Sequence, residues 1–147
     1  MWFTDIELDA LKRWIGLYWN GEWYKPLEDL SRDYKDSQLY KLTQEYLKSR
    51  GKSKITLYRW ETGNSSHSRL QSWVIDKQTA MSYKKYRPGG KLLVKSFPIE
   101  KVFFTFDIDM MNEEDDSYEE DFYWATNIYW RELLGTYPCQ EYIVFAE

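Results

Sequence analysis

The sequence predicts an α+β fold in which a helical layer over residues 1–50 packs on a β-rich half over residues 55–147. Apolar side chains recur every three or four residues before Gly51, which is the spacing of amphipathic helices. After Gly51 the chain changes to short aromatic and β-branched runs bounded by turn residues, which is typical of strands. The 147 residues contain no internal repeat and no linker-like stretch, so we expect a single domain.

Each helix expected in the first part has its own start or stop signal. Thr4 and Glu7 have the spacing of a capping box, in which each side chain binds an amide at the helix start. Pro26 favours the first turn of a second helix. A third helix is expected to begin near Asp36 or Ser37 and to end at Gly51. Together these signals predict three consecutive helices.

The second part of the chain carries the turn residues that separate strands. A Gly-Asn-Ser-Ser-His-Ser loop separates the first two strands, Asp76 is placed to cap a helix, and Pro88-Gly89-Gly90 forms a turn. Strands are expected over residues 55–60, 70–75, 91–97, 99–106 and 140–145, and a helix over 76–86. The last strand is mostly apolar, so we expect it inside the sheet.

Composition excludes several classes of protein. Hydrophobic residues make up 43% of the chain and charged residues 30%, which excludes a disordered chain. No apolar run has the length of a membrane span and the N-terminus lacks the core of a signal peptide, so we expect a cytoplasmic protein without membrane contact. With only one cysteine, Cys139, and one histidine, His67, we expect neither an internal disulfide nor a metal site.

The net charge of −4 hides an uneven distribution along the chain. Residues 1–50 carry a net charge of −1, residues 51–101 one of +8, and residues 102–147 one of −11. The overall acidity argues against nonspecific binding of nucleic acid, which requires an excess of cations. Two interpretations remain open at this point: the basic and acidic segments neutralise each other in the fold, or the acidic segment, including 113–121, meets a basic partner.

Three segments place a single polar residue where it can take part in chemistry. Taken alone, an arginine in a strand is usually a surface residue or part of a structural ion pair. A serine there is often a polar strand end, and a glutamate at a strand start is usually solvated. The segments are Leu57-Tyr58-Arg59-Trp60, the strand and helix cap from Leu70 to Asp76 with Ser72, and the apolar run that Glu141 opens.

Taken in this order, the segments resemble the Arg-Ser-Glu class of mono-ADP-ribosyltransferases. The family's aromatic–Arg strand corresponds to Tyr58-Arg59, its Ser-x-x-x-Asp segment to Ser72 and Asp76, and its late glutamate followed by three apolar residues to Glu141. The resemblance covers about residues 55–145. It implies a split β-sandwich core behind N-terminal helices, nicotinamide adenine dinucleotide (NAD) as co-substrate, and no metal.

The resemblance also implies a role for each catalytic residue. Arg59 would bind the diphosphate of NAD through parallel hydrogen bonds of its guanidinium group. Glu141 would stabilise the cation that forms on the ribose when the bond to nicotinamide breaks. Ser72 would hold Glu141 and the ribose in register by hydrogen bonding.

Further residues complete the expected site. Tyr58 would belong to the cofactor-binding set. Trp73 or Tyr83 would stack on the nicotinamide ring, although core packing explains both at least as well. Tyr137 and Cys139 lie just before the late glutamate, in the stretch with which family members recognise their target.

The function that the resemblance implies is transfer of ADP-ribose from NAD to a macromolecule. A small chain of this kind is similar to the stand-alone enzymes that bacteriophages make to alter host proteins, so the expected partner is a host protein and the expected place of action is the host cytoplasm. Two alternatives remain. The same fold could hydrolyse NAD without an acceptor, or the chain could be a non-enzymatic protein whose acidic third blocks a basic, nucleic-acid-binding surface.

Overall fold

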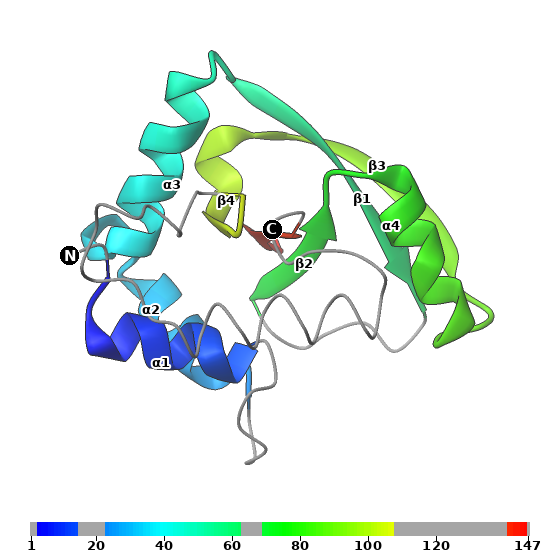
Figure 1. The fold of residues 1–147 in the computed structure, drawn as a ribbon, viewed down its shortest axis with the longest axis horizontal. Coiled ribbons are helices and arrows are strands. Elements are labelled where there is room, and N and C mark those ends of the chain that lie inside the picture. Colours follow the sequence, from blue (N-terminus) through cyan, green and yellow to red (C-terminus); the bar gives the residue numbers. More distant parts are fainter. Residues whose placement is uncertain (1–2, 15–22, 63–68, 108–140, 147) are drawn as a thin grey trace, which may run out of the picture.

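The computed structural model describes residues 3–14, 23–62, 69–107 and 141–146. These residues form helices and one five-stranded antiparallel sheet, so the predicted α+β class is confirmed (Figure 1). None of the described helices has the length and apolarity needed to cross a membrane. The stretches 113–121 and 135–140, which include Tyr137 and Cys139, lie outside the described residues, as does His67.

The three helices of the first part begin where their start signals predict, which are side-chain caps for the first and third and Pro26 for the second. They are α1 (Asp5–Trp14), α2 (Lys25–Arg32) and α3 (Gln38–Ser49). The Thr4 amide donates to Glu7 Oε1 at 2.9 Å and the Glu7 amide donates to Thr4 Oγ1 at 3.1 Å, which is the expected capping box. The hydroxyl of Ser37 accepts from the amide of Leu39 at the start of α3. Local side-chain capping therefore fixes the starts of α1 and α3.

The sheet has the strand order β3-β1-β2-β5-β4. Its strands are β1 (Lys54–Glu61), β2 (Leu70–Val74), β3 (Lys91–Pro98), β4 (Val102–Thr105) and β5 (Glu141–Phe145). The short helix α4 (Lys77–Ser82) follows β2, and Asp76 caps it by accepting from the Thr79 amide at 3.2 Å. The last strand lies between β2 and β4, as expected, whereas the strand predicted from residue 99 begins three residues later, after the 3-10 turn Ile99–Lys101.

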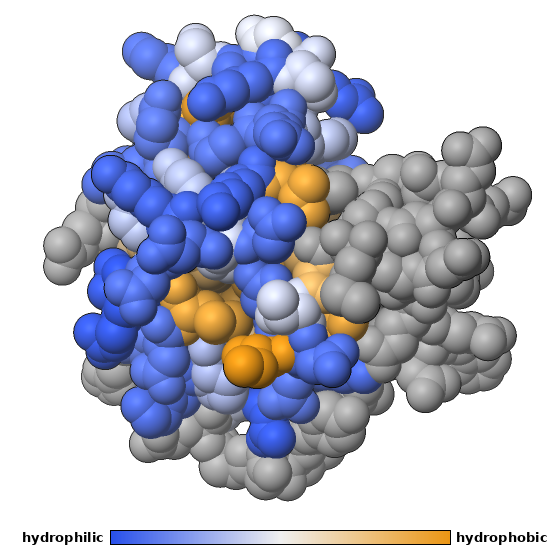
Figure 2. Space-filling model, turned by 90° about the vertical axis from the view of Figure 1, so that its left-hand side faces the viewer, coloured by the Kyte–Doolittle hydropathy of each residue, from blue (hydrophilic) through white to orange (hydrophobic). Residues whose placement is uncertain are grey.

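Two apolar clusters cover the two faces of the sheet. Alternation along β5 assigns Ile143 to the cluster beneath α1–α3, and Tyr142 and Val144 to the other one. The first cluster includes Leu11 of α1 and Leu27 of α2, both fully buried, so the helical layer and the sheet share a core. The side of the molecule that carries these helices is mostly hydrophilic on its outside (Figure 2), because their apolar sides face inward.

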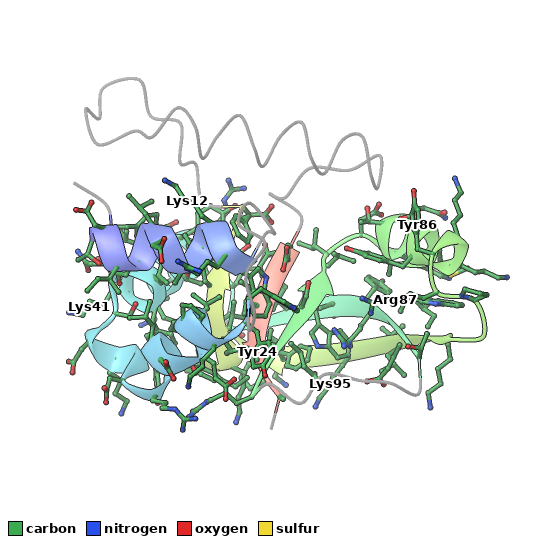
Figure 3. All side chains as sticks on the ribbon, turned by 90° about the horizontal axis from the view of Figure 1, so that it is seen from below. Lys12, Tyr24, Lys41, Tyr86, Arg87 and Lys95 are labelled. Atoms are coloured by element: carbon green, nitrogen blue, oxygen red, sulfur yellow. The ribbon has the colours of Figure 1, made fainter. Side chains whose placement is uncertain are left out.

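The sheet is almost divided between β1 and β2. Strands β1 and β3 pair along their whole length, from Lys54↔Pro98 to Glu61↔Lys91, whereas β1 and β2 are paired only at Tyr58↔Val74. Helices α1–α3 lie at one end of the molecule and α4 at the other, near Arg87 (Figure 3). All described strands belong to one sheet, and the candidate site lies where that sheet divides.

Candidate functional site

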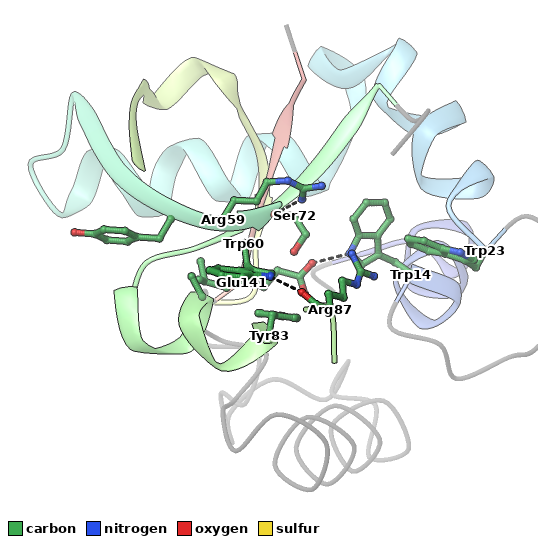
Figure 4. Close-up of a pocket in the computed structure, with 11 residues that line it drawn as sticks. Trp14, Trp23, Arg59, Trp60, Ser72, Tyr83, Arg87 and Glu141 are labelled. Carbon is green, nitrogen blue, oxygen red and sulfur yellow. Dashed lines mark hydrogen bonds between the residues drawn. The ribbon is translucent and has the colours of Figure 1, made fainter. Parts of the chain in front are cut away.

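A pocket of about 170 Å³ lies at this division, with walls from α1, β1, β2, α4 and β5 (Figure 4). Arg59, Ser72 and Glu141 all line it, although they come from three strands. The register explains part of this convergence. Val74 pairs with both Tyr58 and Glu141, so these three side chains share one face of the sheet, and Ser72 lies on the same face two residues earlier.

Glu141 is the most deeply placed charged group of the pocket, with 4% of its surface exposed. Its Oε2 accepts a hydrogen bond of 2.7 Å from the indole Nε1 of Trp14. Its Oε1 is buried and makes no hydrogen bond of normal geometry within the described residues. Burial raises the pKa of Glu141, and the nearby Trp14 N–H and Ser72 hydroxyl oppose the rise. The carboxyl group is therefore half satisfied, with one oxygen held and one left for a ligand.

Arg59 fills the gap that opens between β1 and β2. Its Nη1 donates to the backbone oxygen of Ser72 at 2.7 Å, at a point where β2 has no ladder partner on β1. Its Nε is buried without a hydrogen bond, 3.8 Å from Glu61 Oε1. Burial lowers the pKa of Arg59, Glu61 opposes this, and the positive charge of Arg87 adds to it. The group stays cationic at neutral pH, because an arginine side chain remains protonated in proteins.

Aromatic rings form most of the remaining wall. Trp14 and Trp23 meet edge to face with their centroids 5.1 Å apart, and Trp23 remains 46% exposed. On the other side Trp60 donates from Nε1 to the backbone oxygen of Arg87 at 2.8 Å. A Cβ at Gly90 would stand 2.5 Å from that same Nε1, so only glycine lets the turn come so close to the indole ring. The pocket thus combines flat apolar walls with two guanidinium groups.

The other predicted site residues divide into three groups. Tyr58 and Tyr83 line the pocket. Trp73 does not: it is 4% exposed, packs against Phe97 with ring centroids 5.0 Å apart, and belongs to the apolar cluster on the opposite face. The prediction that Trp73 stacks on nicotinamide is therefore corrected, because neighbours in a strand point to opposite faces and Ser72 faces the pocket. The predicted target-recognition residues lie outside the described part of the chain.

Sequence reasoning assigned no site role to six of the residues that line the pocket, which are Trp14, Trp23, Trp60, Val74, Ala80 and Arg87. Trp14 follows Leu11 at helical spacing and has the pattern of an ordinary core residue. Arg87 stands before a Pro-Gly-Gly turn, where a basic side chain is usually solvated. No local pattern distinguishes these residues from structural ones.

The described residues contain no group of three His, Cys, Asp or Glu side chains placed to hold a metal ion. No family model matches the chain, and neither a curated protein nor a solved structure matches it significantly. Proposals about function therefore rest on the site itself.

Proposed function

We propose that this chain is a mono-ADP-ribosyltransferase that cleaves NAD at the bond between ribose and nicotinamide and transfers ADP-ribose to a macromolecule, with a protein as the target and the cytoplasm as the place of action. The observation that carries the proposal is the convergence of Arg59, Ser72 and Glu141 in one pocket. These are the residues of the Arg-Ser-Glu pattern, and 82 positions separate the first from the last.

The proposed reaction needs a buried negative charge beside the ribose. When the bond between C1′ and the nicotinamide nitrogen breaks, the electron pair leaves with nicotinamide and a positive charge spreads over C1′ and the ring oxygen. The Glu141 carboxylate would stabilise this cation more than the neutral sugar, which is the requirement for catalysis. The acceptor then forms a bond to C1′ with its own electron pair and loses its proton to solvent. Oε1 supports this role because, within the described residues, it makes no hydrogen bond of normal geometry and can accept one from a ribose hydroxyl.

The two guanidinium groups suit the diphosphate of NAD. Arg59 uses Nη1 on the backbone oxygen of Ser72 and its Nε lies 3.8 Å from Glu61 Oε1, so the guanidinium brings a positive charge to the pocket, and Arg87 brings a second one. Pockets for ligands of drug size have about 300–1,000 Å³. The volume of about 170 Å³ therefore suits the nicotinamide ribose end of the dinucleotide, with the remainder outside.

The test is transfer of label from NAD that carries radioactive phosphorus in its adenylate half. The wild type and two variants, Glu141→Gln and Glu45→Gln, are incubated with labelled NAD and a bacterial lysate. Glu45 is an exposed glutamate of α3 away from the pocket and serves as the matched control. We expect label on discrete proteins with the wild type and Glu45→Gln, and a loss of about 100-fold or more with Glu141→Gln.

Other outcomes separate the alternatives. Release of nicotinamide without transferred label would replace the transferase by an NAD hydrolase that uses the same pocket. Wild-type protein that leaves NAD intact would contradict both enzymatic functions and leave the non-enzymatic, acidic partner-binding function.

A further inference from the structure

The N-terminal helical layer contributes one side chain directly to the carboxylate of the pocket. Trp14 is the last residue of α1, and its Nε1 reaches Oε2 of Glu141 across 127 positions of sequence. Both side chains are buried, Trp14 at 8% exposure and Glu141 at 4%. An indole has a single N–H and no acceptor, so the whole polar capacity of Trp14 is used in this contact. In Figure 4 the dashed line between the two groups marks it.

The indole ring is held in place by its surroundings and not by the hydrogen bond alone. Trp14 belongs to the apolar cluster that includes Ala10 and Leu11 of the same helix, both fully buried. The ring of Trp23 meets it edge to face at an interplanar angle of 67°. A donor fixed in this way determines which oxygen of Glu141 it binds and how the carboxyl group is turned.

We propose that Trp14 is a positioning residue whose N–H fixes Oε2 of Glu141 and thereby leaves Oε1 as the oxygen that receives a hydroxyl of the ligand's ribose. The unpartnered, buried Oε1 in the wall of the pocket is the second observation that points to a ligand. The identity of the ligand rests on the proposed function. The coupling between Trp14 and Glu141 does not, and it can be measured in the free protein.

The contact also affects the charge of Glu141. An N–H donor favours the ionised carboxylate, and it opposes the burial that raises the pKa of this group. Loss of the donor would leave the Ser72 hydroxyl as the other group that opposes burial. The other ionisable groups that line the pocket are Arg59, Arg87, Tyr58 and Tyr83.

The first experiment follows the indole N–H resonances of protein labelled with nitrogen-15 in tryptophan, without any ligand, as the pH is changed. We expect one indole resonance to titrate with a midpoint above the ordinary glutamate value of 4.5, to disappear in Trp14→Phe, and not to titrate in Glu141→Gln. The proposal would be overturned if the pH titration of the indole N–H resonances were the same in the wild type and in Glu141→Gln. Because the wild type and Glu141→Gln suffice for this comparison, the experiment does not depend on the folding of Trp14→Phe.

The second experiment measures nicotinamide release against pH for the wild type, Trp14→Phe and Trp23→Phe. Trp23 contacts Trp14 but does not hydrogen-bond to Glu141, so its variant controls for altered packing. In Trp14→Phe we expect kcat to fall about 10- to 100-fold, the effect of one lost charge-assisted hydrogen bond, and the acid limb of the profile to move to higher pH. Equal profiles in the two variants would contradict the proposal. Absence of turnover in the wild type would defeat the proposed function but leave the resonance test standing.

Discussion

The surroundings of two equally buried glutamates show how the structural part of this molecule differs from its pocket. Glu7 and Glu141 are each 4% exposed. Glu7 accepts hydrogen bonds from the amide of Thr4 at 2.9 Å, the hydroxyl of Ser37 at 2.7 Å and the amide of Gln38 at 2.8 Å, and so joins α1 to the start of α3. Within the described part of the chain, Glu141 accepts one hydrogen bond from an indole, and its other oxygen makes none of normal geometry.

The pKa values of the two carboxyl groups are consequently shifted in opposite directions. Burial raises the pKa of both, but the hydrogen bonds to Glu7 outweigh it and lower the pKa below 4.5, whereas at Glu141 burial prevails and the pKa is raised. A carboxylate that accepts several hydrogen bonds from the protein, such as Glu7, stabilises the fold and has no oxygen available for a ligand. A half-satisfied one costs stability, and such a cost is typical of a functional site.

The largest effect on stability is expected for Glu7→Gln. The amide group of glutamine would turn an N–H donor toward the backbone donors that now bind the carboxylate, and the charge of the acceptor would be lost. We expect the free energy of unfolding to fall by about 1.5–3 kcal/mol, measured by urea denaturation at neutral pH. A change within 0.5 kcal/mol, as expected for an exposed control such as Glu45→Gln, would mean that Glu7 is not the link between α1 and α3.

The same substitution at Glu141 is expected to change the free energy of unfolding in the opposite direction. In Glu141→Gln the indole N–H of Trp14 still finds an oxygen acceptor, while the desolvated charge disappears. We expect the free energy of unfolding to rise by about 1 kcal/mol, with a corresponding rise in Tm. A clear loss of stability would show that Glu141 is a structural carboxylate like Glu7.

The smallest expected effect is the pH dependence of the stability differences between the wild type and the two glutamine variants. It is also the most specific one, because it depends on the pKa of each glutamate. A lowered pKa in the folded state means that the stability due to Glu7 is present above 4.5 and is lost as the pH falls through the folded value. For Glu141 the raised pKa means that the cost is present at neutral pH and disappears as the pH falls through a value above 4.5. Urea denaturation at several pH values gives the difference in the free energy of unfolding between the wild type and each variant. As the pH is lowered, we expect this difference to vanish at a higher pH for Glu141→Gln than for Glu7→Gln. The reverse order would contradict both assignments.

Much of the fold could be predicted from local sequence because its signals are local. The capping box at Thr4, the caps at Ser37 and Asp76, Pro26 and the turn residues place the helix starts and most strands within a few residues, since each signal acts on its own backbone. The strand that was expected to begin at residue 99 begins at Val102, because residues 99–101 form a 3-10 turn after Pro98 that leaves no clear pattern in the sequence. The sheet order, by contrast, depends on contacts between distant segments.

The candidate site was predictable only in part for the same reason. The resemblance brought together Arg59, Ser72 and Glu141, but it did not state which face of β2 each neighbour occupies. For Trp73, stacking and core packing were both left open, and the structure places it in the apolar cluster on the face away from the pocket. Trp14 could not be found from sequence, because a hydrogen bond across 127 positions leaves no trace in the spacing of nearby residues.

Nicotinamide release from NAD by the wild type, Glu141→Gln and Glu7→Gln, at a pH near 7 where the folded fraction of each has been verified, is the most direct test of the claim that this pocket cleaves NAD. We expect release by the wild type, comparable release per folded molecule by Glu7→Gln, and a rate at least about 100-fold lower for Glu141→Gln. No release by the wild type, or equal rates for the wild type and Glu141→Gln, would contradict the claim.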